Sequence, residues 1–203
     1  MVAVSQRVEH LADRGEARDA LDQRLIHFLD AAGLIPAPVP NGLCAASSDI
    51  EGSRDALGSW LEAIKPQGFV LSGGDNIGLH GDRDLTEERL LNHARQYQKP
   101  LLGICRGMQM MGVWAGMSLR PVQGHIGTRH SLYGKIYGDV NSFHGLSLAA
   151  CPEGFELLAK SEDGEIEAMC HQSLPWEGWM WHPEREESYI ARDIHRVRAL
   201  FDE

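Results

Sequence analysis

Residues 99–116, KPLLGICRGMQMMGVWAG, constrain the fold of this chain more than any other stretch. The run 101–104 is short and apolar and follows a proline, which is typical of a buried β-strand. Residues 108–115 are mostly apolar and good helix formers, which predicts a buried helix. Cys105 lies between the two patterns. The stretch therefore predicts a strand that turns sharply into a helix, with a cysteine at the turn.

The glycines around this cysteine indicate a nucleophile elbow. Gly103 and Gly107 lie two residues before and after Cys105, where glycine lets the backbone turn tightly and leaves the middle side chain exposed. The helix N-terminus beyond the turn favours a thiolate electrostatically. The alternative is a buried, inert cysteine at an ordinary strand–helix turn. The elbow pattern makes Cys105 a candidate nucleophile.

Strand and helix patterns alternate along the first half of the chain. Apolar runs and a proline-confined segment predict strands over 2–4, 34–39 and 68–71, the middle one at an edge or in a loop. Helical spacing of apolar residues predicts helices over 21–32, 57–64 and 85–97. A polar loop is expected between the first strand and the first helix. Because strands and helices alternate, we expect a parallel, doubly wound α/β sheet.

After Met117 the helical periodicity disappears until the C-terminal end. Extended runs between turn signals predict strands that complete and flank the sheet, over 139–142, 156–159, 166–170 and 178–181. A last helix is expected over 190–201. Because the chain shows no internal repeat, low-complexity segment or linker, we expect one domain over residues 1–203.

Composition narrows the class of protein further. The chain has 203 residues and a net charge of −10, which argues against broad binding to the phosphate backbone of nucleic acids. It contains no apolar run of about 18 residues that would predict a membrane span, and its first residues lack an apolar signal segment. We therefore expect a cytoplasmic protein. The four cysteines form no CxxC pair and are expected to be reduced.

A histidine–acid pair late in the chain supplies the base that an activated cysteine needs. Pro183 biases His182 toward an extended conformation, in which residues two apart point to the same side. We therefore expect His182 and Glu184 side by side, with Glu184 orienting the imidazole. The imidazole would activate the thiol and later protonate the leaving group. The alternative is a histidine at a strand end beside a surface glutamate.

Backbone amides near the elbow are candidates for an oxyanion hole. Gly73 and Gly74 directly follow a predicted strand, and the N–H of Arg106 directly follows the candidate nucleophile. Both positions lie at the carboxyl ends of predicted strands, where open α/β sheets place their sites. For the glycine pair the alternative is a plain strand–helix turn.

Five segments follow one another along the chain: SGGD (72–75), GICRGMQ (103–109), VNSFHG (140–145), DGEIEA (163–168) and WHPE (181–184). In this order they resemble the class I glutamine amidotransferase-like family, in particular its γ-glutamyl hydrolase branch, peptidase family C26. The resemblance implies a three-layer, mostly parallel, flavodoxin-like α/β fold. It also implies hydrolysis of a γ-glutamyl amide through a glutamyl-thioester on Cys105.

The same resemblance implies roles for individual residues. Cys105 is expected as the nucleophile, His182 as the base and Glu184 as its orienting acid, with the amides of Gly74 and Arg106 in the oxyanion hole. Residues expected to hold the glutamyl group are Gly73, Gln109, Asn141, Ser142 and Phe143. The chain departs from the family directly after the nucleophile, where many members have Leu or Tyr in place of Arg106.

A likeness that runs nearly end to end is to family members that hydrolyse γ-glutamyl-CDP-amidate. It is carried by the segments VSQR (4–7), RDALD (18–22), LLGICRGMQ (101–109), GHIGTRH (124–130), SEDGEIEA (161–168) and WMWHPERE (179–186). It implies release of cytidine diphosphoramidate for the phosphoramidate decoration of bacterial capsular polysaccharide. We expect the diphosphate of such a substrate to meet some of Arg7, Arg106, His125, Arg129 and His130. The alternative for Arg7 and Arg129 is an ordinary surface ion pair.

Other functions stay open on the residues alone. They are a glutaminase subunit that delivers ammonia to a synthetase partner, a hydrolase of γ-glutamyl amines, and a non-catalytic or redox cysteine-elbow protein. The His-Pro-Glu run weighs against the last class. We expect a small-molecule substrate and no cofactor, and the sequence is compatible with a homodimer. Because His125, His130 and His144 match no standard zinc spacing, no metal site is predicted.

Overall fold

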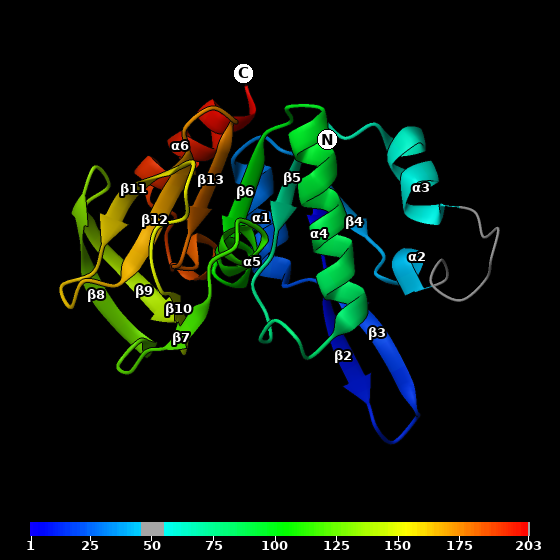
Figure 1. Ribbon diagram of the computed structural model, residues 1–203, viewed down its shortest axis with the longest axis horizontal. Coiled ribbons are helices and arrows are strands. Elements are labelled where there is room, and N and C mark those ends of the chain that lie inside the picture. Colours follow the sequence, from blue (N-terminus) through cyan, green and yellow to red (C-terminus); the bar gives the residue numbers. More distant parts are fainter. Residues whose placement is uncertain (46–54, 203) are drawn as a thin grey trace.

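The computed structural model describes residues 1–45 and 55–202, and a nine-stranded sheet organises them (Figure 1). The strands lie in the order β4-β1-β5-β6-β13-β12-β11-β8-β9. In that order they span Pro36–Val39, Val2–Ser5, Gly68–Leu71, Leu101–Ile104, Trp176–Trp179, Ile166–His171, Phe155–Lys160, Ile126–Gly134 and Gly138–Phe143. The first five are parallel to their neighbours, and the pairs from β13 to β9 are antiparallel.

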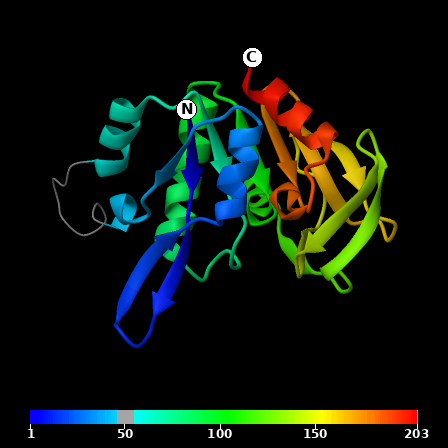
Figure 2. The same ribbon diagram turned by 180° about the vertical axis from the view of Figure 1, so that it is seen from behind.

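Helices cover both faces of the sheet, which gives the protein three layers. The longer ones are α1 Gln23–Ala31, α3 Ala56–Ile64, α4 Gly81–Gln96, α5 Arg106–Trp114 and α6 Ala191–Phe201, and α2 is the short Gly42–Ala45. Helices α4 and α5 lie on one face, and α1 and α6 lie on the other (Figures 1 and 2). The three-layer α/β architecture with parallel strands around the elbow is confirmed. No described helix is long and apolar enough to cross a membrane.

Each face of the parallel strands carries its own hydrophobic core, because successive side chains of a strand point to opposite faces. Leu71 of β5 packs in a cluster with Met108 of α5 and Leu90 of α4. Val70, one residue earlier, packs in a second cluster with Phe28 of α1. Both clusters are fully buried at these positions. The near-continuous apolar strands of the sequence are therefore the ones buried on both faces, as parallel strands are.

Residues 7–20 differ from the predicted polar loop, because they form a hairpin of β2 Arg7–Leu11 and β3 Glu16–Ala20. The hairpin projects from the sheet beyond the carboxyl end of β1 (Figure 1). Its residues are exposed or half-buried, so neither face requires apolar side chains. The alternation that identifies a strand in a sequence comes from burial of one face, and it is missing here for that reason.

Strands in the second half were also missed by the sequence. β8 has one buried residue, Leu132, among its nine, and its two glycines and one histidine hide the strand pattern. Short β7 Leu119–Pro121 and β10 Leu146–Leu148 pair with each other apart from the main sheet. The predicted strands near 139–142, 156–159 and 166–170 are confirmed as β9, β11 and β12. The last predicted strand, 178–181, ends earlier, at Trp179.

Candidate active site

The elbow at the end of β6 forms as the sequence predicts, and it is strained. Cys105 has φ 50° and ψ −104°, a left-handed conformation that costs a non-glycine residue about 1–3 kcal/mol. Its N–H donates to the carbonyl of Trp179 over 2.7 Å, which fixes the turn to β13. A Cβ atom at Gly107 would collide with the carbonyl oxygen of Leu71. Glycine at that position lets α5 begin directly against β5.

His182 reaches the elbow because β6 and β13 are parallel neighbours in register. Ile104 pairs with Trp179, so the residues after both strands emerge at the same edge of the sheet. His182 and Glu184 are buried, and Nδ1 of the imidazole lies 2.6 Å from Oε1 of the carboxylate. The expected pair therefore forms. It forms through a 3₁₀ turn, η1 Pro183–Arg185, and not through an extended strand.

The side chains of Cys105 and His182 interact directly, and this sets the charge of the imidazole. Burial by itself lowers the pKa of His182, but the charge and hydrogen bond of Cys105 and the carboxylate of Glu184 together raise that pKa to about 9. Because Glu184 holds Nδ1, Nε2 is the ring nitrogen free to exchange a proton with sulfur. The site thus stabilises the imidazolium that forms when the thiol is deprotonated.

Asn141 fixes the backbone of the histidine from the antiparallel half of the sheet. Its Oδ1 accepts from the N–H of His182 at 3.0 Å, and its Nδ2 donates to the carbonyl of His182 at 2.7 Å and to Glu186 at 2.7 Å. The buried Ser142 donates its hydroxyl to the carbonyl of His125 at 2.7 Å. Both side chains are engaged within the protein, so they position the site. Contact with a glutamyl group would fall to their backbone.

Phe143 and Gln109, also expected to hold the glutamyl group, lie on either side of this region. Phe143 is 41% exposed and presents its ring edge-on to His182, with the ring centres 5.9 Å apart. The buried Gln109 donates from Nε2 to the carbonyl of Leu146 at 2.9 Å. Gln109 therefore ties α5 to β10, while Phe143 faces the space in front of the imidazole.

The glycine pair after β5 lies against His182. A Cβ atom at Gly73 would come within 2.5 Å of Cε1 of His182, so only glycine fits there. Gly74 has φ +150°, and a Cβ atom there would collide with the guanidinium of Arg83. Arg83 donates to the carbonyl of Ser72 at 2.8 Å and to that of Gly73 at 3.1 Å. The loop is thus held in place by a buried cation.

A buried ion cluster lies beneath the elbow, and sequence reasoning missed it. Arg83 and Arg106 both pair with Glu87, and Arg106 also pairs with Asp84. Ser5 donates its hydroxyl to Glu87 at 2.7 Å. Burial alone would raise the pKa of Glu87, but the two guanidiniums hold that pKa below its usual value. Arg83 and Glu87 stand four apart on α4, a spacing that in a sequence reads as a surface pair.

Arg106 is therefore not an available cation, which corrects one expectation for the diphosphate. Its side chain is 2% exposed, and its two terminal nitrogens pair with the carboxylates of Asp84 and Glu87. Only its backbone N–H, at the start of α5, can serve a substrate. His125 and His130 are a second correction, because both rings face the buried Glu167 of β12 and not the elbow.

Two arginines of the expected set, and one that was missed, border the site. Arg7 lines a narrow cavity together with Gly73 and His182, and pairs with Glu9 at 3.0 Å. Arg129 pairs with Glu186 at 2.9 Å and lines an open cleft of about 670 Å³. Arg185 lines the same cleft, with its guanidinium 4.7 Å from the ring centre of Phe143. The sequence feature that could have identified Arg185 as a residue of the site is its position directly after Glu184.

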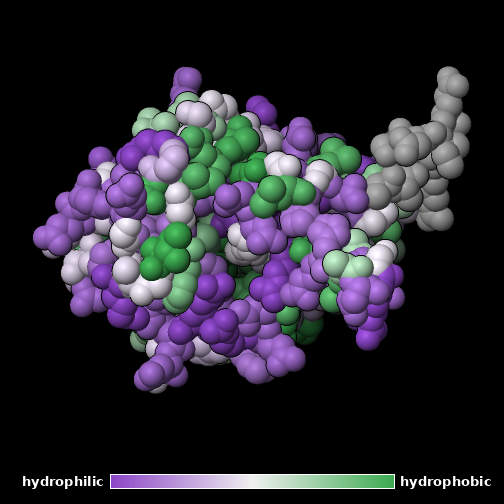
Figure 3. All heavy atoms as spheres, turned by 90° about the horizontal axis from the view of Figure 1, so that it is seen from below, coloured by the Kyte–Doolittle hydropathy of each residue, from purple (hydrophilic) through white to green (hydrophobic). Residues whose placement is uncertain are grey.

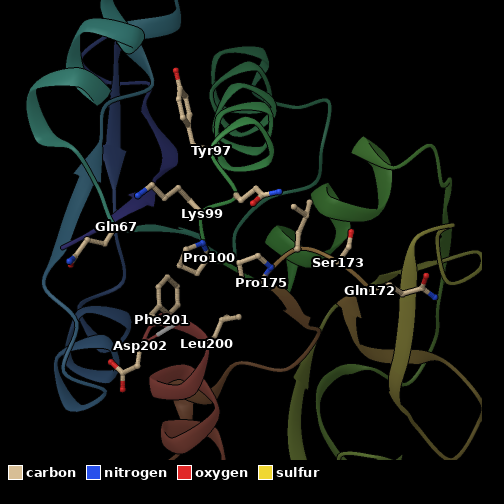
Figure 4. Close-up of a pocket in the computed structure, with 12 residues that line it drawn as sticks. Gln67, Tyr97, Lys99, Pro100, Gln172, Ser173, Pro175, Leu200, Phe201 and Asp202 are labelled. Atoms are coloured by element: carbon tan, nitrogen blue, oxygen red, sulfur yellow. The ribbon is translucent and has the colours of Figure 1, made fainter.

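A separate cavity of about 620 Å³ lies at the other edge of the sheet (Figure 4). Lys99 and Pro100, which precede β6, and Pro175, which precedes β13, are among its lining residues. Cys105 and His182 follow the same two strands, so this cavity and these two residues lie at opposite strand ends. Because parallel α/β sheets bind ligands beyond the carboxyl ends of their strands, we place the candidate site at the elbow. The surface at the carboxyl ends of the strands is largely hydrophilic around a central hollow (Figure 3).

Comparisons with known proteins agree with this geometry. Residues 44–195 match the model of the family described as glutamine amidotransferase class-I. A γ-glutamyl-CDP-amidate hydrolase of Campylobacter jejuni is 33% identical over 123 residues, which cover 58% of this chain and 62% of that protein. One subunit of the glutamine-hydrolysing GMP synthase of Thermococcus kodakarensis is 32% identical over 153 residues, covering 67% of this chain and 76% of that protein.

Solved structures share the fold at lower sequence identity. A crystal structure of a Thermoplasma acidophilum protein, described as one subunit of a GMP synthase, aligns with a TM-score of 0.72 at 20% identity, covering 100% of this chain and 94% of that one. A glutamine amidotransferase of Thermotoga maritima aligns with a TM-score of 0.60 at 17% identity, covering 99% and 82%. At these identities the likeness shows the fold alone.

Proposed function

Because the chain belongs to the class I glutamine amidotransferase family, we propose that it hydrolyses a γ-glutamyl amide and releases L-glutamate. The proposal is carried by the strained Cys105, whose side chain meets an imidazole that is itself held by a buried carboxylate. A nucleophile, a base and an orienting acid in this order are the parts that acyl transfer needs. Cys105, His182 and Glu184 are the proposed triad.

The first half of the reaction forms a thioester. Nε2 of His182 takes the thiol proton, and the sulfur of Cys105 attacks the γ-carbonyl carbon of the substrate. The carbonyl oxygen becomes an oxyanion, for which the amides of Gly74 and Arg106 are the proposed donors. The intermediate collapses as His182 returns the proton to the departing nitrogen, which leaves a glutamyl-thioester on Cys105.

The second half restores the enzyme. Water enters where the amine departed, and His182 takes a proton from it as the water oxygen attacks the thioester carbon. The C–S bond then breaks, the sulfur regains a proton from His182, and glutamate leaves. In the thioester the sulfur of Cys105 carries neither a proton nor a charge, so the carboxylate of Glu184 against Nδ1 is the contact that stabilises the imidazolium in this half of the reaction.

For the leaving group we propose a nucleoside diphosphoramidate, with γ-glutamyl-CDP-amidate as the substrate. The cleft beside His182 supports it: Arg129 and Arg185 line the cleft with Phe143, and guanidiniums and an exposed ring suit a diphosphate and a base. The relative from Campylobacter jejuni is named for this substrate. The product would be cytidine diphosphoramidate, a precursor for the phosphoramidate of capsular polysaccharide.

A second candidate is a glutaminase subunit that feeds ammonia to a synthetase. It is supported by the relatives that are subunits of GMP synthase, which are covered over 76% of their length. This chain would then hydrolyse glutamine weakly alone and faster with its synthetase partner. Under either function we propose that residues 1–203 act as one domain, because β1, near the start, and β13, near the end, lie in one sheet.

The test is turnover of γ-glutamyl-CDP-amidate, glutamine and simple γ-glutamyl amines by the purified protein. We expect the nucleotide-linked substrate to be preferred in kcat/KM, and mass spectrometry of acid-quenched enzyme to find a glutamyl adduct on Cys105. A tenfold preference for glutamine, about 1.4 kcal/mol, would reject the leaving group but keep the hydrolase. Absence of turnover of all three, with or without a synthetase partner, would reject the hydrolase.

A further inference from the structure

Four side chains that lie on or beside strands β8, β9 and β12 converge inside the antiparallel half of the sheet. Glu167 of β12 is fully buried, and His125 and His144 are 3% and 2% exposed. Oε1 of Glu167 lies 3.4 Å from Nδ1 of His125, 3.3 Å from Nε2 of His130 and 3.4 Å from Nε2 of His144. Nδ1 of His125 and Nε2 of His144 are 3.1 Å apart. We call these four residues the histidine cluster.

The outer nitrogens of two rings are already occupied. Nε2 of His125 lies 3.0 Å from a carboxylate oxygen of Asp163, and Nδ1 of His144 lies 3.0 Å from the carbonyl oxygen of Leu146. Both oxygens are acceptors, so each outer nitrogen carries the proton. In a neutral imidazole the other ring nitrogen then carries no proton and presents a lone pair, and this is Nδ1 in His125 and Nε2 in His144. The two lone pairs face each other and the carboxylate of Glu167.

Such a set of electron-pair donors repels itself unless a positive charge lies between its members. Three buried atoms of the cluster are without a hydrogen-bond partner among residues 1–45 and 55–202. They are the two carboxylate oxygens of Glu167 and Nε2 of His130. Glu87 in the ion cluster differs, because hydrogen bonds from Arg83 and Ser5 satisfy it. The histidine cluster therefore needs a positive charge of the kind that the ion cluster already has, and either a metal ion or a proton on one ring would supply it.

The distances from Glu167 to the three rings are close to those between neighbouring ligands of a transition-metal ion. In a tetrahedral site with metal–ligand bonds of about 2.0 Å, neighbouring ligand atoms are about 3.3 Å apart. The separations from Glu167 to the three rings have that length, and the donor atoms of His125, His130 and Glu167 all lie within 4.8 Å of one another. Second-sphere acceptors on the outer nitrogens are the usual support of metal-bound histidines.

We propose that His125, His130, His144 and Glu167 bind a divalent transition-metal ion, Zn²⁺ above all, in a closed structural site. Three imidazoles and one carboxylate fill a tetrahedral zinc shell and leave no position for substrate. The ion would join β8, β12 and the segment that follows β9. Asn141 of β9, three residues before His144, holds the backbone of His182, so the metal would stiffen the scaffold of the catalytic histidine.

The first experiment measures bound metal in tag-free protein. After treatment with a chelator, incubation with Zn²⁺ and gel filtration, wild type is expected to hold about one equivalent. His130→Gln should hold less than about a tenth of that, because one ligand is gone. The matched control is His195→Gln, an exposed histidine on α6, which should bind as wild type does. Equal zinc in His130→Gln and wild type overturns the proposal.

A second pair of measurements does not depend on a buried substitution. Asp163 is half exposed and contacts His125 only from outside, so Asp163→Asn should fold and bind Zn²⁺ about tenfold or more weakly. Wild type loaded with Co²⁺ should show visible d–d absorption at the intensity of a tetrahedral N/O site, and His130→Gln should not. Wild type that folds but takes up no more metal than His130→Gln, in either measurement, shows a purely hydrogen-bonded cluster and rejects the site.

Discussion

The molecule buries one glutamate under the elbow and another in the antiparallel half of the sheet. The two buried carboxylates are neutralised in different ways. Glu87 lies between Arg83 and Arg106, whose charges are permanent. Glu167 lies among three imidazoles, which carry charge only when protonated or when a metal binds them. The comparison teaches that the charge balance of the ion cluster beneath Cys105 rests on permanent charges, whereas the charge balance of the histidine cluster depends on protons or metal.

The largest expected effect leaves both regions intact. Cys105→Ala should lower the rate of glutamate release by at least about 1,000-fold, because no other group can form the thioester. The variant should still fold and unfold cooperatively, since alanine keeps the backbone of the turn and touches neither cluster. Enzyme assay and urea unfolding check this, with Cys151→Ala as the control that retains activity. A variant with a tenth of the wild-type rate removes Cys105 from the nucleophile role.

Glu87→Gln should give the largest loss of stability. It leaves two guanidiniums buried without their carboxylate, which costs about 3–5 kcal/mol in the free energy of unfolding. Glu9→Gln, which removes the partner of the half-exposed Arg7, should cost less than about 1 kcal/mol. Urea titration measures both. Equal effects of the two substitutions would show that the ion cluster does not differ from a surface pair.

Glu167→Gln should remove the response to metal in the other region. A ligand at a hundred times its dissociation constant stabilises the folded state by about 2.7 kcal/mol, so Zn²⁺ should raise the melting temperature of chelator-treated wild type. The same addition should leave Glu167→Gln unchanged, and it should still raise the melting temperature of Glu9→Gln. If the melting temperature of wild type is the same with and without Zn²⁺, the histidine cluster does not bind the metal and, like the ion cluster, is stable without it.

The pH dependence of His182 should report on the elbow. A pKa raised to about 9 in the folded state stabilises the protonated form, so this contribution to stability is complete below about pH 6.5 and is lost as the pH rises through 9. Cys105→Ala removes the interactions of the sulfur, so the pKa of His182 should fall in that variant. An NMR titration of the imidazole measures it. An unchanged pKa would show that the sulfur and the ring do not interact.

The smallest effect concerns the rim of the cleft. Arg129 is half exposed and already paired with Glu186, so Arg129→Gln should raise KM for γ-glutamyl-CDP-amidate by less than about tenfold. Turnover of glutamine, which lacks the diphosphate, should stay as in wild type, and Arg14→Gln on the distant hairpin turn serves as the control. Equal losses on both substrates would place Arg129 with the scaffold and not with the leaving group.

How far the sequence predicts this molecule depends on how local each feature is. The elbow and the His182–Glu184 pair involve neighbours in the chain, so their spacing could be read directly, even though η1 replaced the expected strand. The hairpin of β2 and β3 could not be read, because a strand exposed on both faces loses its alternation. Arginine usually marks a surface, so the burial of Arg83 and Arg106 had no signal.

The histidine cluster lies furthest from what a sequence can show. Its members stand at 125, 130, 144 and 167, on or beside three strands, so no short spacing links them. Zinc patterns known from sequences place ligands on one turn or one helix, and this set is assembled by strand pairing alone. Asn141 is similar, because its contact with His182 joins residues forty-one apart. Such contacts follow from the register of the sheet.

The left-handed backbone of Cys105 has a consequence for how such a protein can change. Glycine would fit this conformation without cost, so a chain selected for thermal endurance alone would drift toward glycine at position 105. Cysteine is retained at this position despite its strained backbone, and the packing of the surrounding residues offsets the conformational cost. In homologues that have lost the reaction, the cysteine is no longer needed, and we expect glycine to replace it at the position that corresponds to Cys105.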